Sequence, residues 1–98
     1  MGESIALFVE PRKVLSQTAC VYGLSVDTLR GRTKARLASE ARAVACFVAY
    51  RTGSVTYDAL AEELGRSRQG VWKMVEGVAE KLRAGNRRVT RAVSAVTG

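Results

Sequence analysis

Arg68, Gln69 and Lys73 are the side chains of this 98-residue chain whose types and spacing best suit the recognition of another molecule. We expect them in the first turns of a helix that begins near Arg68, on the side turned away from its apolar stripe. In the major groove of DNA an arginine can bind a guanine and a glutamine can bind an adenine, each through two hydrogen bonds. Lys73 can reach a base edge or a phosphate. These residues therefore predict that an exposed helix reads bases.

Two short helices joined by a tight turn, within residues 57–74, must position these side chains. Gly65 can adopt the positive φ that ends the first helix, and Ser67 can cap the second. This pattern is typical of a helix-turn-helix, although a plain helical hairpin in an all-α domain has the same spacing. The predicted apolar stripes are Leu60, Ala61 and Leu64 in the first helix, and Val71, Met74, Val75, Val78 and Leu82 in the second.

Two residues inside the second helix carry further expectations. Trp72 lies beside the apolar stripe, so we expect it to pack against a neighbouring helix in preference to contacting a sugar or a thymine methyl group. Gly70 costs about 1 kcal/mol relative to alanine in a helix interior. Its presence therefore indicates a close approach of the backbone to another group.

A basic loop is predicted at residues 30–36, where basic residues alternate with small ones and no acid intervenes. Beside a helix-turn-helix, such a loop is placed to bind phosphates or to enter a minor groove, and a solvated charged loop is the plain alternative. The net charge of +7 and the acids gathered on the first motif helix favour a polyanionic partner, first of all nucleic acid. The basic residues of the loop are Arg30, Arg32, Lys34 and Arg36.

The rest of the chain predicts an all-α fold, a small bundle of five to six helices. Residues 10–98 are expected to form one domain, and residues 1–9 a tail of unknown role. A helix over residues 40–51 is the most apolar and is expected to be central. The other helices are predicted at residues 10–22, 26–29, 57–64, 68–82 and 87–96, with N-caps at Ser25, Ser39, Thr56, Ser67 and Asn86.

Several functional classes lack the residues they require. The chain has no histidine, no cluster with metal-ligand spacing, no phosphate-binding GxxxxGK[ST] loop and no nucleophile with a recognisable base, so we expect no enzyme, cofactor, metal or small-molecule substrate. Cys20 and Cys46 fall in predicted helices and are expected as buried free thiols. A secretion signal and an apolar run of about 18 residues are both missing, which predicts a cytoplasmic protein without a membrane contact.

This order of helices and loop resembles the C-terminal DNA-binding domain (domain IV) of the bacterial chromosomal replication initiator DnaA, in the Trp-repressor-like helix-turn-helix superfamily. The family carries a Gly-Arg-Asp-His-Thr-Thr-Val signature at the turn and the recognition helix. Gly65, Arg66 and Val71 keep its frame, whereas residues 67–70 replace the centre that reads bases. The stretches that resemble the family are residues 21–29, the basic loop, residues 37–49 and residues 56–82.

The resemblance implies binding of double-stranded DNA in replication initiation or transcription regulation, with Arg66 and the basic loop at phosphates or in a groove. Ser67, Arg68 and Gln69 stand at its reading positions, so the target sequence of the family is not implied. The helix-turn-helix alone is also similar to region 4 of bacterial sigma factors. The alternative function is therefore a protein-interaction module that docks on the replication or transcription machinery.

Overall fold

The computed structural model describes residues 11–33, 35–51 and 55–97, which form six α-helices and no β-strand. The predicted tail at residues 1–9 and the predicted phosphate contact Lys34 lie outside the described residues. No described helix is long and apolar enough to cross a membrane. The helices are α2 (Pro11–Tyr22), α3 (Val26–Arg30), α4 (Arg36–Arg51), α5 (Tyr57–Leu64), α6 (Arg68–Arg83) and α7 (Arg87–Thr97). The predicted small all-α bundle is thus confirmed.

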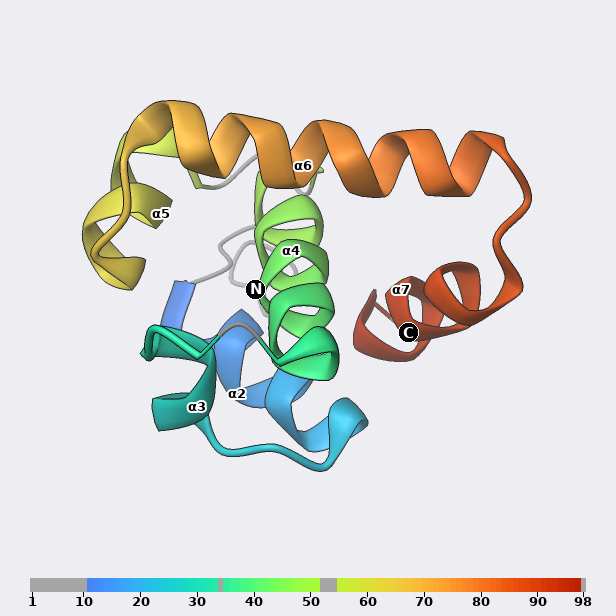
Figure 1. Ribbon diagram of the computed structural model, residues 1–98, viewed down its shortest axis with the longest axis horizontal. Coiled ribbons are helices and arrows are strands. Elements are labelled where there is room, and N and C mark those ends of the chain that lie inside the picture. The colour runs from blue at the N-terminus through green and yellow to red at the C-terminus, as the bar shows by residue number, and fades with distance from the viewer. Residues whose placement is uncertain (1–10, 34, 52–54, 98) are drawn as a thin grey trace, which may run out of the picture.

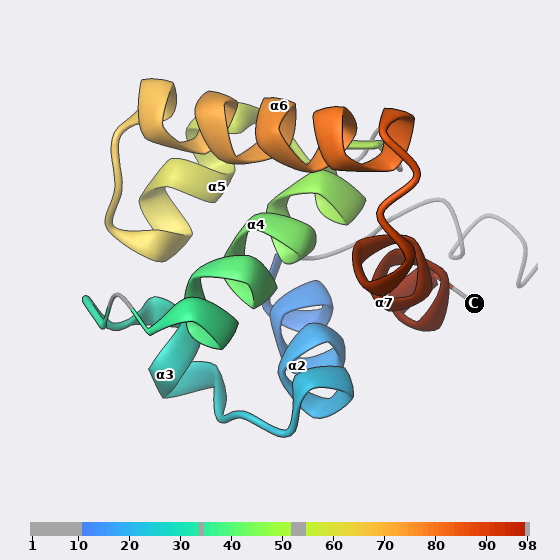
Figure 2. The same cartoon turned by 45° about the vertical axis from the view of Figure 1, so that its right-hand side comes forward.

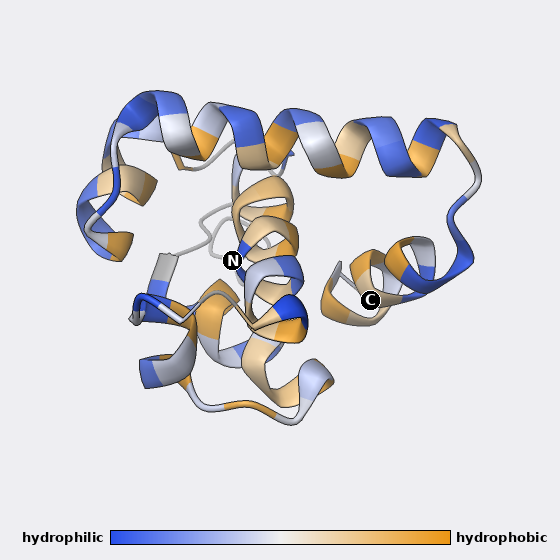
Figure 3. Ribbon diagram, viewed as in Figure 1, coloured by the Kyte–Doolittle hydropathy of each residue, from blue (hydrophilic) through white to orange (hydrophobic). Residues whose placement is uncertain are grey.

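The central helix is α4, as expected from its composition. It contacts α2, α3, α6 and α7, and α6 crosses one end of it while α2 and α3 lie toward the other (Figures 1 and 2). Figure 3 shows that α4 is hydrophobic along most of its length, whereas polar and apolar residues alternate along α6. Ala41 and Ala45 are buried in α4, and their small side chains let neighbouring helices approach closely. Val71, Val75 and Val78 form the buried side of α6, so its other side is left to solvent.

The start of α4 differs from the prediction. The helix begins at Arg36, not at residue 40, and Ser39 lies inside it instead of capping it. The backbone N–H of Ser39 donates to the Ala35 carbonyl oxygen at 2.9 Å, so the helical bonding already runs through this turn. The segment Arg36 to Ala38 consists of good helix formers, which outweighed the capping preference of a single serine. Because α3 extends through Arg30 and α4 begins at Arg36, these two residues of the predicted loop lie in helices.

The two cysteines differ in their environments. Cys46 is buried, as predicted, and burial raises the pKa of its thiol to about 12. Cys20 is exposed, so the prediction of a buried thiol was wrong for this residue. Val14, Leu15, Thr18 and Ala19 occupy the buried side of α2. One residue further along the helix turns Cys20 by about 100° away from that side.

A buried carboxylate fastens three helices together. Glu40 of α4 accepts hydrogen bonds from the Tyr22 hydroxyl of α2, at 2.7 Å, and from the Arg88 guanidinium of α7, at 2.9 Å. Burial and the bond to this carboxylate raise the pKa of the Tyr22 hydroxyl. The bonds satisfy both carboxylate oxygens, as a buried charged group requires. They therefore fix α2 and α7 against the central helix.

The helix-turn-helix has the predicted caps. Gly65 adopts φ 64°, and its N–H reaches the Ala61 and Glu62 carbonyl oxygens to close α5. Ser67 then caps α6 by accepting a hydrogen bond from the Gly70 N–H at 3.0 Å. Ser25 and Thr56 cap α3 and α5 in the same way, and Asn86 accepts from the Val89 N–H at 3.0 Å at the start of α7. The local signals for helix ends were therefore correct where the structure describes them, apart from Ser39.

Two glycine substitutions test the conformation of the turn. Gly65→Ala should lower the free energy of unfolding by about 1 kcal/mol, because an added Cβ strains a left-handed backbone. Gly77→Ala, inside α6, should raise it by about 0.5 to 1 kcal/mol, because alanine is the better helix former. At neither position would the added Cβ meet an atom beyond its own helical turn within 4 Å. Thermal unfolding should thus show melting temperatures shifted in opposite directions, and shifts of the same sign would contradict the assigned conformations.

Candidate nucleic-acid interface

The first turns of α6 present the three predicted reading side chains to solvent. Arg68, Gln69 and Lys73 are all exposed. Arg68 forms an ion pair with Asp58 of α5 at 3.7 Å, and both side chains are more than two-thirds exposed, so this pair is weak and can exchange for another partner. The face of α6 opposite its buried valines is therefore available for a ligand.

Gly70 has a local role in this helix start. A Cβ at Gly70 would lie 3.2 Å from the Ser67 hydroxyl oxygen, which is the oxygen that accepts the Gly70 N–H bond. That distance is shorter than the distance in most Cβ contacts. Glycine at this position thus leaves room for the cap, and the close approach that the sequence indicated is met by a group within the chain.

Trp72 is only partly buried, so the predicted packing against a neighbouring helix is incomplete. Its side chain is 46% exposed. The helix phase explains this, because Val71 and Val75 face the core and the residue after Val71 is rotated by about 100° toward solvent. Trp72 lies one turn beyond Arg68 and Gln69, and these three residues line a shallow pocket with Tyr57. An aromatic ring therefore stands among the predicted base readers.

The basic loop is bound by an arginine that is not among the predicted site residues. Arg42 of α4 is only 5% exposed, and its guanidinium donates to three carbonyl oxygens at the end of α3 and in the loop. The Nε–O distance to Leu29 is 2.6 Å, and Nη2 lies 3.2 Å from the Gly31 oxygen and 3.4 Å from the Thr33 oxygen. Burial lowers the pKa of Arg42, and the nearby charge of Arg66 lowers it further. The loop backbone is thus bound to the central helix.

Arg66, in the turn of the helix-turn-helix, binds the same loop from the other side. Its Nη1 donates to the Leu64 carbonyl oxygen at 3.0 Å, and its Nη2 donates to the Gly31 carbonyl oxygen at 2.9 Å. The Gly31 oxygen therefore accepts from both Arg42 and Arg66. This shared acceptor joins the central helix, the basic loop and the turn that starts α6.

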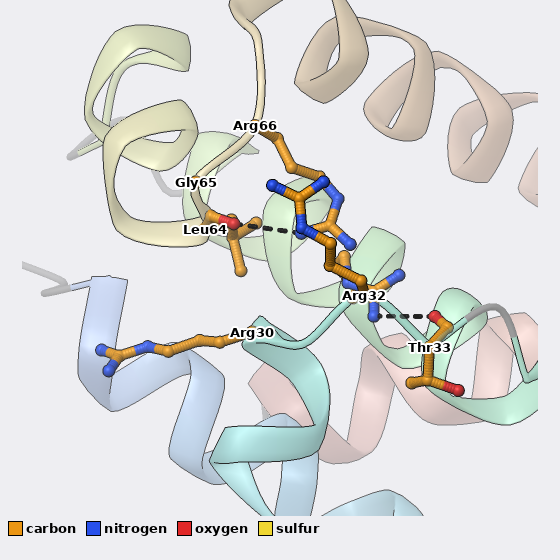
Figure 4. A pocket seen from close by; sticks show the side chains of 7 residues that line it. Arg30, Arg32, Thr33, Leu64, Gly65 and Arg66 are labelled. Carbon is orange, nitrogen blue, oxygen red and sulfur yellow. Dashed lines mark hydrogen bonds between the residues drawn. The ribbon is translucent and has the colours of Figure 1, made fainter.

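A pocket of about 500 Å³ lies at this junction (Figure 4). The side chains of Arg32 and Arg66 point toward one another there, while Arg30 points away from both. No described carboxylate lines the pocket or pairs with Arg42 or Arg66. Guanidinium groups that converge without a counter-ion create a positive potential that attracts anions. Its lining residues are Arg30, Arg32, Thr33, Arg42, Leu64, Gly65 and Arg66.

The side chains of two predicted loop contacts do not join those of Arg32 and Arg66. Arg30 forms an ion pair with Glu63 of α5, which also pairs with Arg12 of α2 at 3.7 Å. Arg36 lines a different pocket, together with Glu40 and Arg88. The structure thus brings Arg32 and Arg66 together beside the start of α6, but it does not gather all the predicted basic residues on one surface.

A sequence signal for Arg42 was present. Positions 38, 41, 45 and 49 hold alanines on the buried side of α4, and Arg42 falls on the same side, four residues after Ala38. A cation on an apolar stripe requires buried acceptors, so its position indicated an internal anchor. Tyr57 gave no such signal, because its place beside Trp72 depends on how α5 and α6 cross.

No model of a known protein family matches the chain, and no curated protein sequence is significantly similar to it. The DnaA-like order of helices therefore stays a resemblance.

Removal of the internal anchor should destabilise the protein. Arg42→Met should lower the free energy of unfolding by about 2 kcal/mol, because buried carbonyl oxygens lose a charged donor. Arg32→Met is the matched control: it removes the same charge, but Arg32 is exposed and donates no hydrogen bond to a described residue, so its effect should stay within about 0.5 kcal/mol. Thermal unfolding followed by circular dichroism measures the stability of both variants. Equal melting temperatures of the two variants would show that Arg42 does not anchor the loop.

Proposed function

We propose that the protein binds double-stranded DNA, with α6 in the major groove and the loop between α3 and α4 on the neighbouring phosphate backbone. The observation that carries this proposal is the junction at the Gly31 carbonyl oxygen. There Arg42 and Arg66 hold a basic loop and an arginine-lined pocket next to the start of α6. The proposed activity is binding without catalysis, cofactor or metal, in the cytoplasm, in replication initiation or transcription regulation.

Base reading is assigned to the exposed start of α6. Arg68 can bind guanine and Gln69 can bind adenine, and each such pair is worth about 1 to 3 kcal/mol of discrimination against a wrong base. Lys73, one turn further along, reaches a base edge or a phosphate. The ion pair of Arg68 with Asp58 is solvated on both sides, so DNA can replace the carboxylate at small cost.

Phosphate binding is assigned to the loop and the turn. Arg32 is exposed and has no described partner, so its whole guanidinium is available. Arg66 uses two nitrogens on backbone carbonyls and keeps N–H groups for an anion. A phosphate at this pocket would also offset the repulsion between the charges of Arg42 and Arg66. Contacts of this kind set the register of a protein on the duplex without reading its sequence.

Salt dependence tests this proposal. If about five basic side chains displace counterions from phosphates, the logarithm of the association constant should fall with the logarithm of salt concentration with a slope of about −4 to −5. Fluorescence anisotropy with a labelled random-sequence duplex, repeated at several salt concentrations, measures this slope. Arg32→Ala should reduce the magnitude of the slope by about 1. Lys13→Ala is the control and should leave the slope unchanged, since Lys13 is exposed on α2, and α2 and α6 lie toward opposite ends of α4 (Figure 1).

A slope near zero, or no change in anisotropy at low salt, would contradict DNA binding and favour the protein-interaction alternative. Equal losses from Arg32→Ala and Lys13→Ala would show that net charge matters and that the proposed surface does not.

A further inference from the structure

The exposed face of α6 contains an aromatic surface that hydrogen bonding to bases leaves unexplained. Trp72 is the only tryptophan of the chain and has 46% of its surface exposed, one turn from Arg68 and Gln69. Indole rings are among the most favourable groups to bury on binding. A tryptophan left exposed beside two hydrogen-bonding side chains therefore indicates an apolar group on the ligand.

The wall beside Trp72 is held in place. The ring of Tyr57 stacks on Tyr50 with 4.3 Å between the ring centroids and 9° between the planes. Tyr57, Trp72, Arg68 and Gln69 together line a shallow pocket of about 460 Å³. It has aromatic sides and hydrogen-bond donors at its edge. Such a site suits a flat ligand that offers an apolar group next to polar acceptors.

The charge around the pocket selects the class of ligand. Arg68 lines it and Lys73 is the next residue after Trp72, and both are exposed cations. Exposed cations beside an aromatic pocket therefore favour a polyanion as the ligand of this face. Along α6, residues three to four positions apart are separated by about 5 Å, which corresponds to about one to two base-pair steps. Trp72 thus reaches the base pairs next to those that Arg68 and Gln69 read.

The major groove of DNA presents one exposed apolar group, the C5 methyl group of thymine. We propose that the pocket formed by Trp72 and Tyr57 receives a thymine methyl group, so that the protein selects A·T pairs beside the bases bound by Arg68 and Gln69. This inference rests on the proposed function, because it places the same face of α6 in the major groove. It adds an apolar specificity determinant to that face.

Replacement of thymine by uracil tests the inference directly. Two duplexes with the same mixed order of all four base pairs, one made with thymidine and the other with deoxyuridine, have the same phosphates and the same minor-groove hydrogen-bonding groups and differ in the major-groove methyl groups. The wild-type protein should bind the thymidine duplex about threefold to fivefold more tightly for each methyl group buried. Trp72→Ala should bind both duplexes with the affinity that the wild-type protein has for the deoxyuridine duplex. Because Trp72 is exposed, this variant should fold, which circular dichroism verifies.

Val21→Ala is the matched control. Val21 is also a large exposed apolar residue, 42% exposed, but it lies on α2, and its loss should preserve the preference for thymidine. As a second readout, emission from the single tryptophan should change when the wild-type protein binds the thymidine duplex.

The outcomes separate this inference from the proposed function. Equal, salt-dependent binding of the wild-type protein to both duplexes would overturn the methyl pocket and leave DNA binding intact. A preference for thymidine that survives Trp72→Ala would also overturn it, because another side chain would then contact the methyl group. Absence of binding to either duplex at low salt would overturn both proposals, and binding of a protein at Trp72 would then explain its exposure.

Discussion

The arrangement of the candidate interface depends on one buried guanidinium. Arg42 stands on the side of the central helix that alanines occupy elsewhere, and a buried cation is costly unless its N–H groups find acceptors. No described carboxylate pairs with the Arg42 guanidinium. The acceptors are instead carbonyl oxygens of Leu29, Gly31 and Thr33, so the end of α3 and the loop must present their backbone to α4. The conformation of the basic loop is thus set largely by a residue outside it.

The same constraint connects the loop to the helix-turn-helix. Arg66 follows Gly65, whose left-handed conformation turns the chain between α5 and α6, and it reaches the oxygen that Arg42 already holds. The buried valines of α6 fix that helix on α4. The described loop residues, the turn and α6 are therefore connected to one another within the protein, which would reduce the entropy lost on binding a ligand. The positive charges of Arg42 and Arg66 repel each other, and an anion between the two guanidinium groups would reduce that repulsion.

Local features of the structure could be predicted from the sequence, and distant contacts could not. The caps at Gly65, Ser67 and Asn86 depend on a few neighbouring residues, and the stripes of α5 and α6 follow from helical periodicity. By contrast, the partners of Arg30 and Arg66 lie 33 and 35 residues away along the chain. Nothing near Arg30 in the sequence indicates that its side chain will pair with Glu63.

The exposure of Trp72 was missed for a different reason. Val71 directly before it and Val75 three residues after it are core residues, and only the exact helical phase separates Trp72 from them. The start of α4 was missed because a possible serine cap was weighed above the helix propensity of the residues before it. The fold and the position of α6 were therefore predictable, whereas the internal anchor, the arginine pocket and the aromatic pocket required the tertiary structure.

The central claim is that the loop and α6 form one surface that meets DNA together. Titration of the isotope-labelled protein with a short duplex, followed by backbone amide chemical shifts, tests it most directly. The account predicts that amides of residues 31–33 and 66–73 shift in parallel with one dissociation constant, while those of α2 stay unchanged. Shifts confined to α6, or centred on α2 or α7, would contradict it.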